Sequence, residues 1–212
     1  MENTGKTAIK KWIKEEFAPL SKQHGFKIGP YFTSGTFAIY RSNGNGYNCI
    51  WFDIDSNSVG YSMVIRINAV EELLYQYTHK DVFTTIYTVD LSTTHEKFSY
   101  TPRTTKEELA AYLLPLKERF AEVVEQMEYY STPQHVLDLW MSLDTLKQQN
   151  LHFGGPYKFI KMMVIAKQCN SPLYDTLCQN ALEIYRKVIS EGRDYFEELA
   201  TCESVIEHYK QQ

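Results

Sequence analysis

The clearest pair of side chains whose type and spacing could do chemistry is acidic. Asp53 and Asp55 alternate in a run with strand composition, so both carboxylates project from one face of the strand. Two carboxylates on one face could share acid and base roles or bind a divalent cation. No third ligand stands at a suitable spacing in the sequence, and two carboxylates seldom form a dedicated metal site. We therefore predict no metal and no cofactor, and interpret the pair as an acidic strand surface.

Other catalytic motifs are incomplete or missing. Gly5-Lys6-Thr7 matches the end of a phosphate-binding loop, but the leading glycine and the preceding strand that build the phosphate cradle are missing. The six histidines show no metal-binding spacing, and no G-x-S-x-G elbow occurs. His79 and His95 flank one predicted strand. They could meet Asp81 or Asp90 in space, so an enzyme whose polar side chains converge only in three dimensions stays open.

Charge and hydropathy limit the classes of partner. The chain of 212 residues has a formal net charge of -4 and no basic cluster of the kind that binds nucleic acid. Residues 1–14 contain no continuous apolar region, and no apolar run elsewhere approaches the roughly 20 residues that cross a bilayer. The four cysteines form no C-x-x-C pair, which favours reduced thiols. We predict a cytoplasmic protein that binds neither nucleic acid nor membrane and whose acidic surface suits a basic protein partner.

Aromatic side chains are the most unusual feature of the composition. The sequence has 16 tyrosines and 11 phenylalanines, concentrated in the predicted sheet and at 75–77 and 129–130. Most must be core, and core packing is the stronger interpretation for Trp51. An exposed tyrosine nevertheless suits a protein interface, because it joins a large ring to a polar tip. The predicted protein-binding surface consists of Tyr31, Tyr47, Trp51, Asp53, Asp55 and Tyr61.

The first half of the chain predicts one helix and a sheet. Apolar residues from Ile9 to Leu20 fall on one helical face, with Gly25 as a suitable stop and Pro19 expected to bend or shorten the end. From 26 to about 101, aromatic and β-branched runs alternate with glycine, asparagine and serine, which is typical of an antiparallel meander. We predict strands at 37–40, 47–54, 61–67, 82–91 and 97–100, turns at 42–46 and 56–58, and a short helix at 71–77.

The second half has helical periodicity. Thr105 and Glu108 predict a capping box, and Pro115 predicts a kink or two shorter helices within 109–127. Thr132-Pro133 opens a helix that should bury residues up to Leu146. The apolar run 157–166 predicts a central helix, and further helices follow Ser171-Pro172 and at 195–209.

Together these elements predict an α+β protein with an N-terminal helix, an antiparallel meander of about five to six strands and a C-terminal bundle of about five helices. We expect a helix and sheet lobe over residues 1–101 and a helical lobe over 102–212, packed together as one unit.

The exit of the first helix is similar to a bacterial domain family of uncharacterised function. Members of that family open with a helix ending in a PxLKxxGFKxxG stem and continue into an antiparallel sheet, and residues 12–29, WIKEEFAPLSKQHGFKIG, resemble this start. The stem reads here as Pro19, Leu20, Lys22, Gly25, Phe26 and Gly29. Residues 113–140 are similar in kind to the helical portion of the family, whereas the glycine-rich turn at 42–46 departs from it. The resemblance implies a compact cytosolic protein of the sort encoded beside toxin or secretion genes, and it transfers no catalytic residue.

Three functions are compatible with these observations. Our leading hypothesis is a non-enzymatic protein-binding module, in particular an immunity-type inhibitor that fills the cleft of a toxin with the acidic, aromatic sheet surface. The alternative is a hydrolase or transferase, which a deep pocket placing His79 or His95 beside Asp53 would favour. An adaptor or chaperone in a larger assembly is the third, and exposed apolar residues at 157–165 would favour it.

Overall fold

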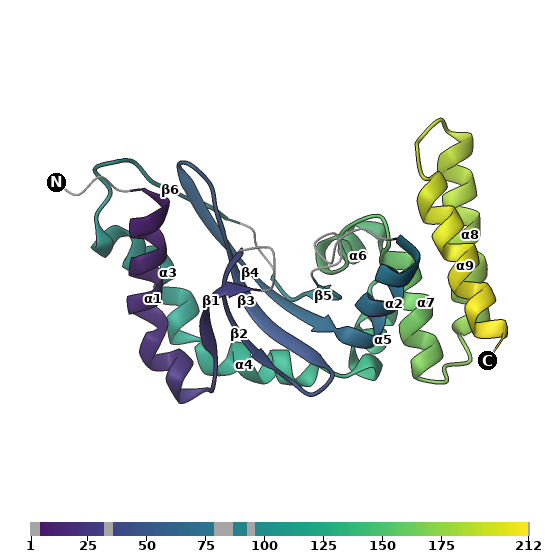
Figure 1. Ribbon diagram of the computed structural model, residues 1–212, viewed down its shortest axis with the longest axis horizontal. Coiled ribbons are helices and arrows are strands. Elements are labelled where there is room, and N and C mark those ends of the chain that lie inside the picture. The colour runs from purple at the N-terminus through teal and green to yellow at the C-terminus, as the bar shows by residue number, and fades with distance from the viewer. Residues whose placement is uncertain (1–4, 32–35, 79–86, 93–95, 212) are drawn as a thin grey trace. The chain divides into compact units, whose positions relative to one another are not determined.

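The computed structural model describes residues 5–31, 36–78, 87–92 and 96–211. The chain forms an N-terminal helix, then a six-strand antiparallel sheet, then a C-terminal helical region (Figure 1). The predicted α+β architecture is therefore confirmed.

Helix α1 (Lys6–Gln23) ends as the sequence predicts. Gly25 has a φ of 71°, and the N–H of Phe26 donates to the carbonyl of Ser21 at 2.8 Å. This is the six-to-one hydrogen bond of a Schellman motif, in which a glycine supplies the left-handed residue. Pro19 lies inside the helix without ending it. The buried face consists of Ile9, Ile13, Phe17 and Ser21.

The sheet has the strand order β1-β2-β3-β4-β5, with β6 paired to β4. The strands are β1 (Lys27–Tyr31), β2 (Thr36–Ser42), β3 (Gly46–Ile54), β4 (Ser58–Ile67), β5 (Val89–Asp90) and β6 (Phe98–Ser99). In the antiparallel register, Ile39 lies opposite Ile28 on one side and opposite Ile50 on the other. Strands β1 to β4 thus form a meander, since each pairs with the next along the chain.

Both predicted turns are present. Between β2 and β3, the N–H of Asn43 donates to the carbonyl of Gly46 at 3.1 Å, and Gly44 has a φ of 85°. Between β3 and β4, the N–H of Asp55 donates to the carbonyl of Ser58 at 2.8 Å. Such short loops fix the register of the strands they join, and with it the face on which each side chain lies.

Eight further helices are described. They are α2 (Asn68–Thr78), α3 (Lys106–Glu118), α4 (Phe120–Tyr129), α5 (Pro133–Ser142), α6 (Leu146–His152), α7 (Lys158–Gln168), α8 (Tyr174–Ser190) and α9 (Phe196–Lys210). The capping box of Thr105 with Glu108 and the cap at Thr132 are confirmed. The predicted division near Pro115 occurs at Arg119, which separates α3 from α4.

The prediction for residues 143–146 was wrong. The helix that Thr132-Pro133 opens ends at Ser142, and Leu146, expected to be buried, is 57% exposed. A separate helix, α6, begins there because Thr145 and Gln148 form a second capping box. Of the strand predicted at 82–91, the structure describes only residues 87–91, and β5 is formed by Val89–Asp90.

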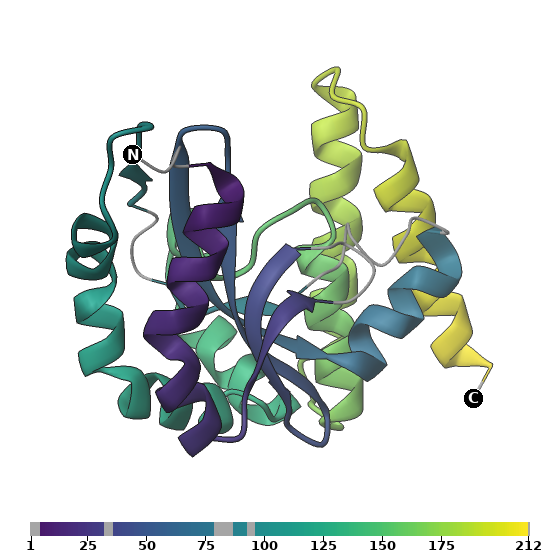
Figure 2. The ribbon, with the colours of Figure 1, turned by 60° about the vertical axis from the view of Figure 1, so that its left-hand side comes forward.

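Contacts divide the chain into two compact units, each made of two stretches of sequence. Unit 1 is Met1–Ile65 with Leu91–Tyr129, and unit 2 is Arg66–Asp90 with Tyr130–Gln212. In unit 1, the rings of Phe17 on α1 and Phe52 on β3 lie 6.1 Å apart, and Figure 2 shows α1 in front of the strands. The boundary expected at 101/102 lies inside unit 1, because α3 and α4 belong to it.

Candidate functional site

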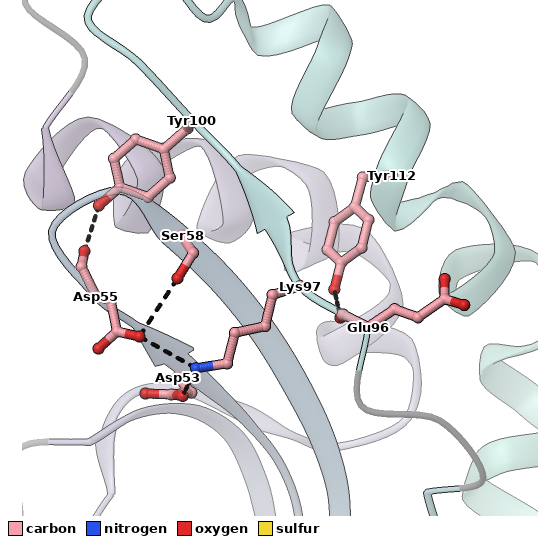
Figure 3. Close-up of polar contacts among 7 residues, drawn as sticks. All are labelled: Asp53, Asp55, Ser58, Glu96, Lys97, Tyr100 and Tyr112. Atoms are coloured by element: carbon pink, nitrogen blue, oxygen red, sulfur yellow. Dashed lines mark hydrogen bonds and ion pairs between the residues drawn. The ribbon is translucent and has the colours of Figure 1, made fainter.

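The tip of the β3–β4 hairpin carries the predicted acidic pair (Figure 3). Asp53 lies near the end of β3, and Asp55 begins the turn. The hydroxyl of Ser58 donates to the carboxylate of Asp55 at 3.3 Å. The phenol of Tyr100 donates to the backbone carbonyl of Asp55 at 2.5 Å. Hydrogen bonds therefore hold both the side chain and the backbone of Asp55.

Lys97 connects the two carboxylates. Its ammonium lies 2.5 Å from Oδ2 of Asp53 and 3.1 Å from Oδ2 of Asp55 (Figure 3). Lys97 reaches them from beside β6, whose Phe98 pairs with Val59 of β4 and so places Lys97 alongside Gly60. A Cβ on Gly60 would lie 3.1 Å from Cγ of Lys97. Because Gly60 has no side chain, the aliphatic part of Lys97 can lie across the strand at this point.

We define the acidic hairpin as Asp53, Asp55, Ser58 and Lys97. Its two carboxylates outnumber its single ammonium, so negative charge is in excess. The hydrogen bond from Lys97, and then its charge, lower the pKa of Asp55. Hydrogen bonds to Asp53 and Asp55 raise the pKa of Lys97. One ammonium thus contacts two carboxylates, whose side chains are 54% and 53% exposed. Such exposed pairs add little to stability, because water and salt screen them.

A row of aromatic rings lies beside the acidic hairpin in unit 1. The rings of Phe98 and Tyr112 stack at 5.4 Å, Tyr112 meets Tyr61 at 5.9 Å, and Tyr61 meets Phe52 at 6.4 Å. The phenol of Tyr112 donates to the carbonyl of Glu96 at 2.8 Å, which fixes the residue before Lys97 (Figure 3). Burial, and then the charges of Tyr61 and Glu96, raise the pKa of Tyr112 to about 12.

The six residues predicted as a protein-binding surface do not all meet. Asp53 and Asp55 come together through Lys97. Tyr47 and Trp51 alternate with Asp53 on β3, so they share its face of the strand, and both are half-buried. Phe52 lies on the opposite face of β3 from Trp51 and Asp53, and its ring packs against Phe17 of α1. Tyr61 contacts Phe52 and therefore lies on that opposite face, toward α1. The backbone of Tyr31 pairs with Thr36, and its side chain lies outside the described residues.

Sequence reasoning missed the groups that hold the acidic pair in place. Lys97 is 44 residues from Asp53, and Tyr100 is 45 residues from Asp55. The strand predicted at 97–100 was the one sequence signal for this contact. A strand paired with β4 places Lys97, the residue before β6, close to the hairpin tip. The sequence did not indicate which strand it would pair with, because β6 has only two residues and little hydrophobic pattern.

Unit 2 contains a second polar cluster, and it is deeply buried. Glu71 on α2 is 0% exposed, and its Oε1 accepts hydrogen bonds from Lys161 on α7 at 3.0 Å and from Thr88 at 2.8 Å. Lys161, which is 5% exposed, also donates to the carbonyl of Tyr87 at 2.6 Å. Among the described residues, Oε2 of Glu71 has no hydrogen-bond partner. Burial raises the pKa of Glu71, and the nearby Lys161 opposes that change.

Several chemical candidates from the sequence lie elsewhere. His79, Asp81 and His95 are outside the described residues. Asp90 is buried in β5, where its carbonyl accepts a hydrogen bond from Nδ1 of His152 at 2.8 Å. Within the described ranges, His, Cys, Asp and Glu side chains nowhere gather in threes that could hold a metal ion. All four cysteines are free thiols, and burial raises the pKa of the fully buried Cys49.

Comparisons with known proteins return no match, whether with family models, with curated proteins or with solved structures. In the part of the chain that the structure describes, each helix is too short or too polar to cross a membrane.

Proposed function

We propose that this chain is a non-enzymatic protein-binding module, and that the acidic hairpin binds a basic surface of another protein. The observation that carries the proposal is the arrangement of Asp53 and Asp55 around the single ammonium of Lys97. Both carboxylates are half exposed. Lys97 donates a hydrogen bond to each of them, and Ser58 donates a further one to Asp55. A charged surface fixed before binding loses less entropy on association and steers a partner of opposite charge.

The finer form of the proposal is an immunity-type inhibitor that acts in the bacterial cytoplasm. Its partner would be a basic, nuclease-like toxin, whose cleft the acidic hairpin would occupy together with the half-buried Tyr47 and Trp51 on the same strand. The support is the charge of the hairpin and the resemblance of residues 12–29 to a family encoded beside toxin or secretion genes. Opposite charges would give fast association that depends on ionic strength.

The test is purification of the tagged chain from its native host, followed by mass spectrometry of the retained proteins. The key variant is Asp53→Lys/Asp55→Lys, and the matched control is Glu118→Lys/Glu125→Lys, which makes the same charge change at exposed positions of α3 and α4. We expect one protein at stoichiometric amount with the wild type and the control, and its loss with the hairpin variant. Retention of that protein by the hairpin variant, or of no protein by the wild type, would refute the proposal.

The enzyme alternative has one observation in its favour, the buried cluster of Glu71, Lys161 and Thr88. Ionisable groups with shifted pKa values often mark active sites, although structural ion pairs shift pKa values as well. The hollows at α6 to α9 in the described part of the chain are lined by other residues. Native mass spectrometry of the purified chain tests the alternative, because a bound small molecule that disappears in Glu71→Gln would favour an enzyme.

The adaptor alternative gains no such support. The apolar run expected to dock a partner forms α7, and Ile160 to Ala166 are all buried. Tyr157, which precedes α7, is 3% exposed, and its phenol donates to Glu197 of α9 at 2.9 Å. Residues 160–166 therefore belong to the core of unit 2.

A further inference from the structure

A groove in unit 2 combines an apolar floor with a positively charged rim. It lies among α6, α7, α8 and the connection from α8 to α9, and its volume is about 630 Å³. Pockets for small molecules typically span roughly 300–1,000 Å³. The floor includes Phe159, Ile184 and Val188. We call this feature the basic groove.

The phenol of Tyr185, which lines the basic groove, already has a hydrogen-bond partner. The phenol of Tyr185 donates to the carbonyl of Pro156 at 2.7 Å, and its ring lies 6.0 Å from Phe159 and 6.3 Å from Tyr195. The ring of Tyr185 therefore presents apolar surface to the groove. At the α6 side, Leu146 is 57% exposed and extends the apolar lining to the surface.

The rim supplies three cations and one carboxylate. Lys158, Lys187 and Arg193 line the groove, and Glu191 is the acidic residue. None of the three cations forms an ion pair with another described residue. The chain as a whole has a net charge of -4, so this local excess of positive charge runs against its overall balance.

Lys158 is a rim cation that contacts the apolar floor. Its ammonium contacts the side-chain oxygen of Asn150 and lies 5.1 Å from the centre of the Phe159 ring. Both partners are neutral. Burial lowers the pKa of Lys158, because the ammonium has lost part of its water. A partly dehydrated ammonium with neutral partners gains more from an anion than a fully hydrated one does.

From this arrangement we propose that the basic groove binds a small amphipathic anion as a free monomer. The apolar body would lie on Phe159, Ile184 and Val188, and a carboxylate or phosphate head would lie among Lys158, Lys187 and Arg193. An anionic ligand matches the rim, and an apolar body matches the floor; a cation of the same shape would meet three like charges. The site is separate from the acidic hairpin, which belongs to unit 1.

Calorimetric titration of the full chain with decanoate, kept below its micelle concentration, tests this proposal. We expect saturable binding of one decanoate per chain, and binding of decyltrimethylammonium at least about tenfold weaker, since several like charges oppose it. Equal affinity for the two probes, or no binding of decanoate, would overturn the proposal. Binding to phosphatidylglycerol vesicles without binding of monomeric decanoate would overturn it as well.

Surface variants locate the binding. Lys187→Glu and Arg193→Glu should each weaken decanoate binding about fivefold or more, because an attraction becomes a repulsion. Glu191→Gln should strengthen it by a smaller factor. Lys14→Glu is the matched control, since it makes the same charge change at an exposed position of α1 and should leave affinity unchanged. Decanoate affinity that Lys187→Glu and Arg193→Glu leave unaltered would place the ligand elsewhere and sink the assignment to this groove.

Discussion

At the scale of single residues, the Glu71–Lys161 pair should be the most sensitive ion pair of the described residues, because both side chains are buried. Lys161→Met keeps the length of the side chain but leaves the carboxylate of Glu71 fully buried without its cation. We expect the free energy of unfolding to fall by ~3–5 kcal/mol, as when one partner of a buried ion pair is removed. Urea denaturation measures the change. Lys14→Met, at an exposed position of α1, should change it by less than about 0.5 kcal/mol.

The double variant Lys161→Met/Glu71→Gln separates the charge from the packing. A neutral amide at position 71 needs no cation, so the double variant should be more stable than Lys161→Met alone. If the double variant loses the sum of both single losses, the pair is not coupled and the cost of Lys161→Met has another origin.

Glu71 should also give the stability of the fold a pH dependence. Burial raises the pKa of Glu71 above its ordinary value of 4.5. As the pH rises through that value, the unfolded chain releases this proton before the folded chain does. The unfolded state then binds fewer protons, so the contribution of Glu71 to stability falls with rising pH, from about 4.5 up to its folded pKa.

The variant Glu71→Gln cannot titrate at position 71, so it is the reference against which the pH dependence of wild-type stability is measured. The free energy of unfolding of the wild type, minus that of Glu71→Gln, should decrease as the pH rises from the ordinary pKa of 4.5 to the raised pKa of the folded state. All other titrating groups cancel in the difference to first order. An increase over the same range would mean that Lys161 outweighs burial and that the pKa of Glu71 is lowered.

The acidic hairpin shows how far residue types alone can lead. The alternation of Asp53 and Asp55 predicted that they share one face, and this follows from the period of two in a strand. The cation between them was not predictable, because Lys97 is 42 residues from Asp55 in sequence and joins it only through the pairing of β6 with β4. Local periodicity contains no information about such distant partners.

At the scale of elements, the glycine that ends α1 offers a direct test of local backbone control. Gly25 has a φ of 71°, and a Cβ there would meet no atom within 4 Å. Gly25→Ala should therefore cost about 1–2 kcal/mol through backbone strain alone, since no new contact clashes. The matched control is Gly29→Ala in β1, where a Cβ also meets nothing within 4 Å but the backbone is not left-handed. Equal losses in thermal or urea unfolding would contradict this assignment.

Elements with a buried face were predictable from the sequence, and the element without one was not. Helix α1 and helix α7 bury periodic or continuous apolar residues, which is the signal that periodicity detects. Helix α6 buries no residue, so its only signal is the capping box of Thr145 and Gln148. Hydrophobic periodicity therefore extended the preceding helix into residues 143–146, where the chain instead turns.

At the scale of the whole molecule, the order of the chain and the order of its packing differ. The chain passes between the two units after Ile65, Asp90 and Tyr129. Composition changes near residue 101, where strand patterns give way to helical ones, and this predicted a boundary there. Packing follows contacts rather than composition, so the first two helices after that point, α3 and α4, join the unit of the sheet.

Phe120 shows why these helices belong with the sheet. Its ring lies 6.0 Å from Phe17, 5.8 Å from Phe26 and 5.4 Å from His24, and its side chain is 1% exposed. Phe120→Ala in the full chain should lower the free energy of unfolding by ~3–5 kcal/mol, the usual cost of truncating a buried aromatic ring. A loss below about 1 kcal/mol would show that this ring is peripheral to the core of unit 1.

The two possible boundaries make opposite predictions for fragments of the chain. A fragment of residues 1–101 lacks Phe120 and all of α3 and α4, so the apolar face of α1 stays partly uncovered. We expect no cooperative urea transition from it. A fragment of residues 1–129 contains all of unit 1, with residues 66–90 of unit 2 as an insert. It retains both helices and should unfold cooperatively, with the near-ultraviolet circular dichroism of packed rings. Cooperative unfolding of 1–101 alone would instead support a boundary at 101/102, because that lobe would then contain a complete core of its own.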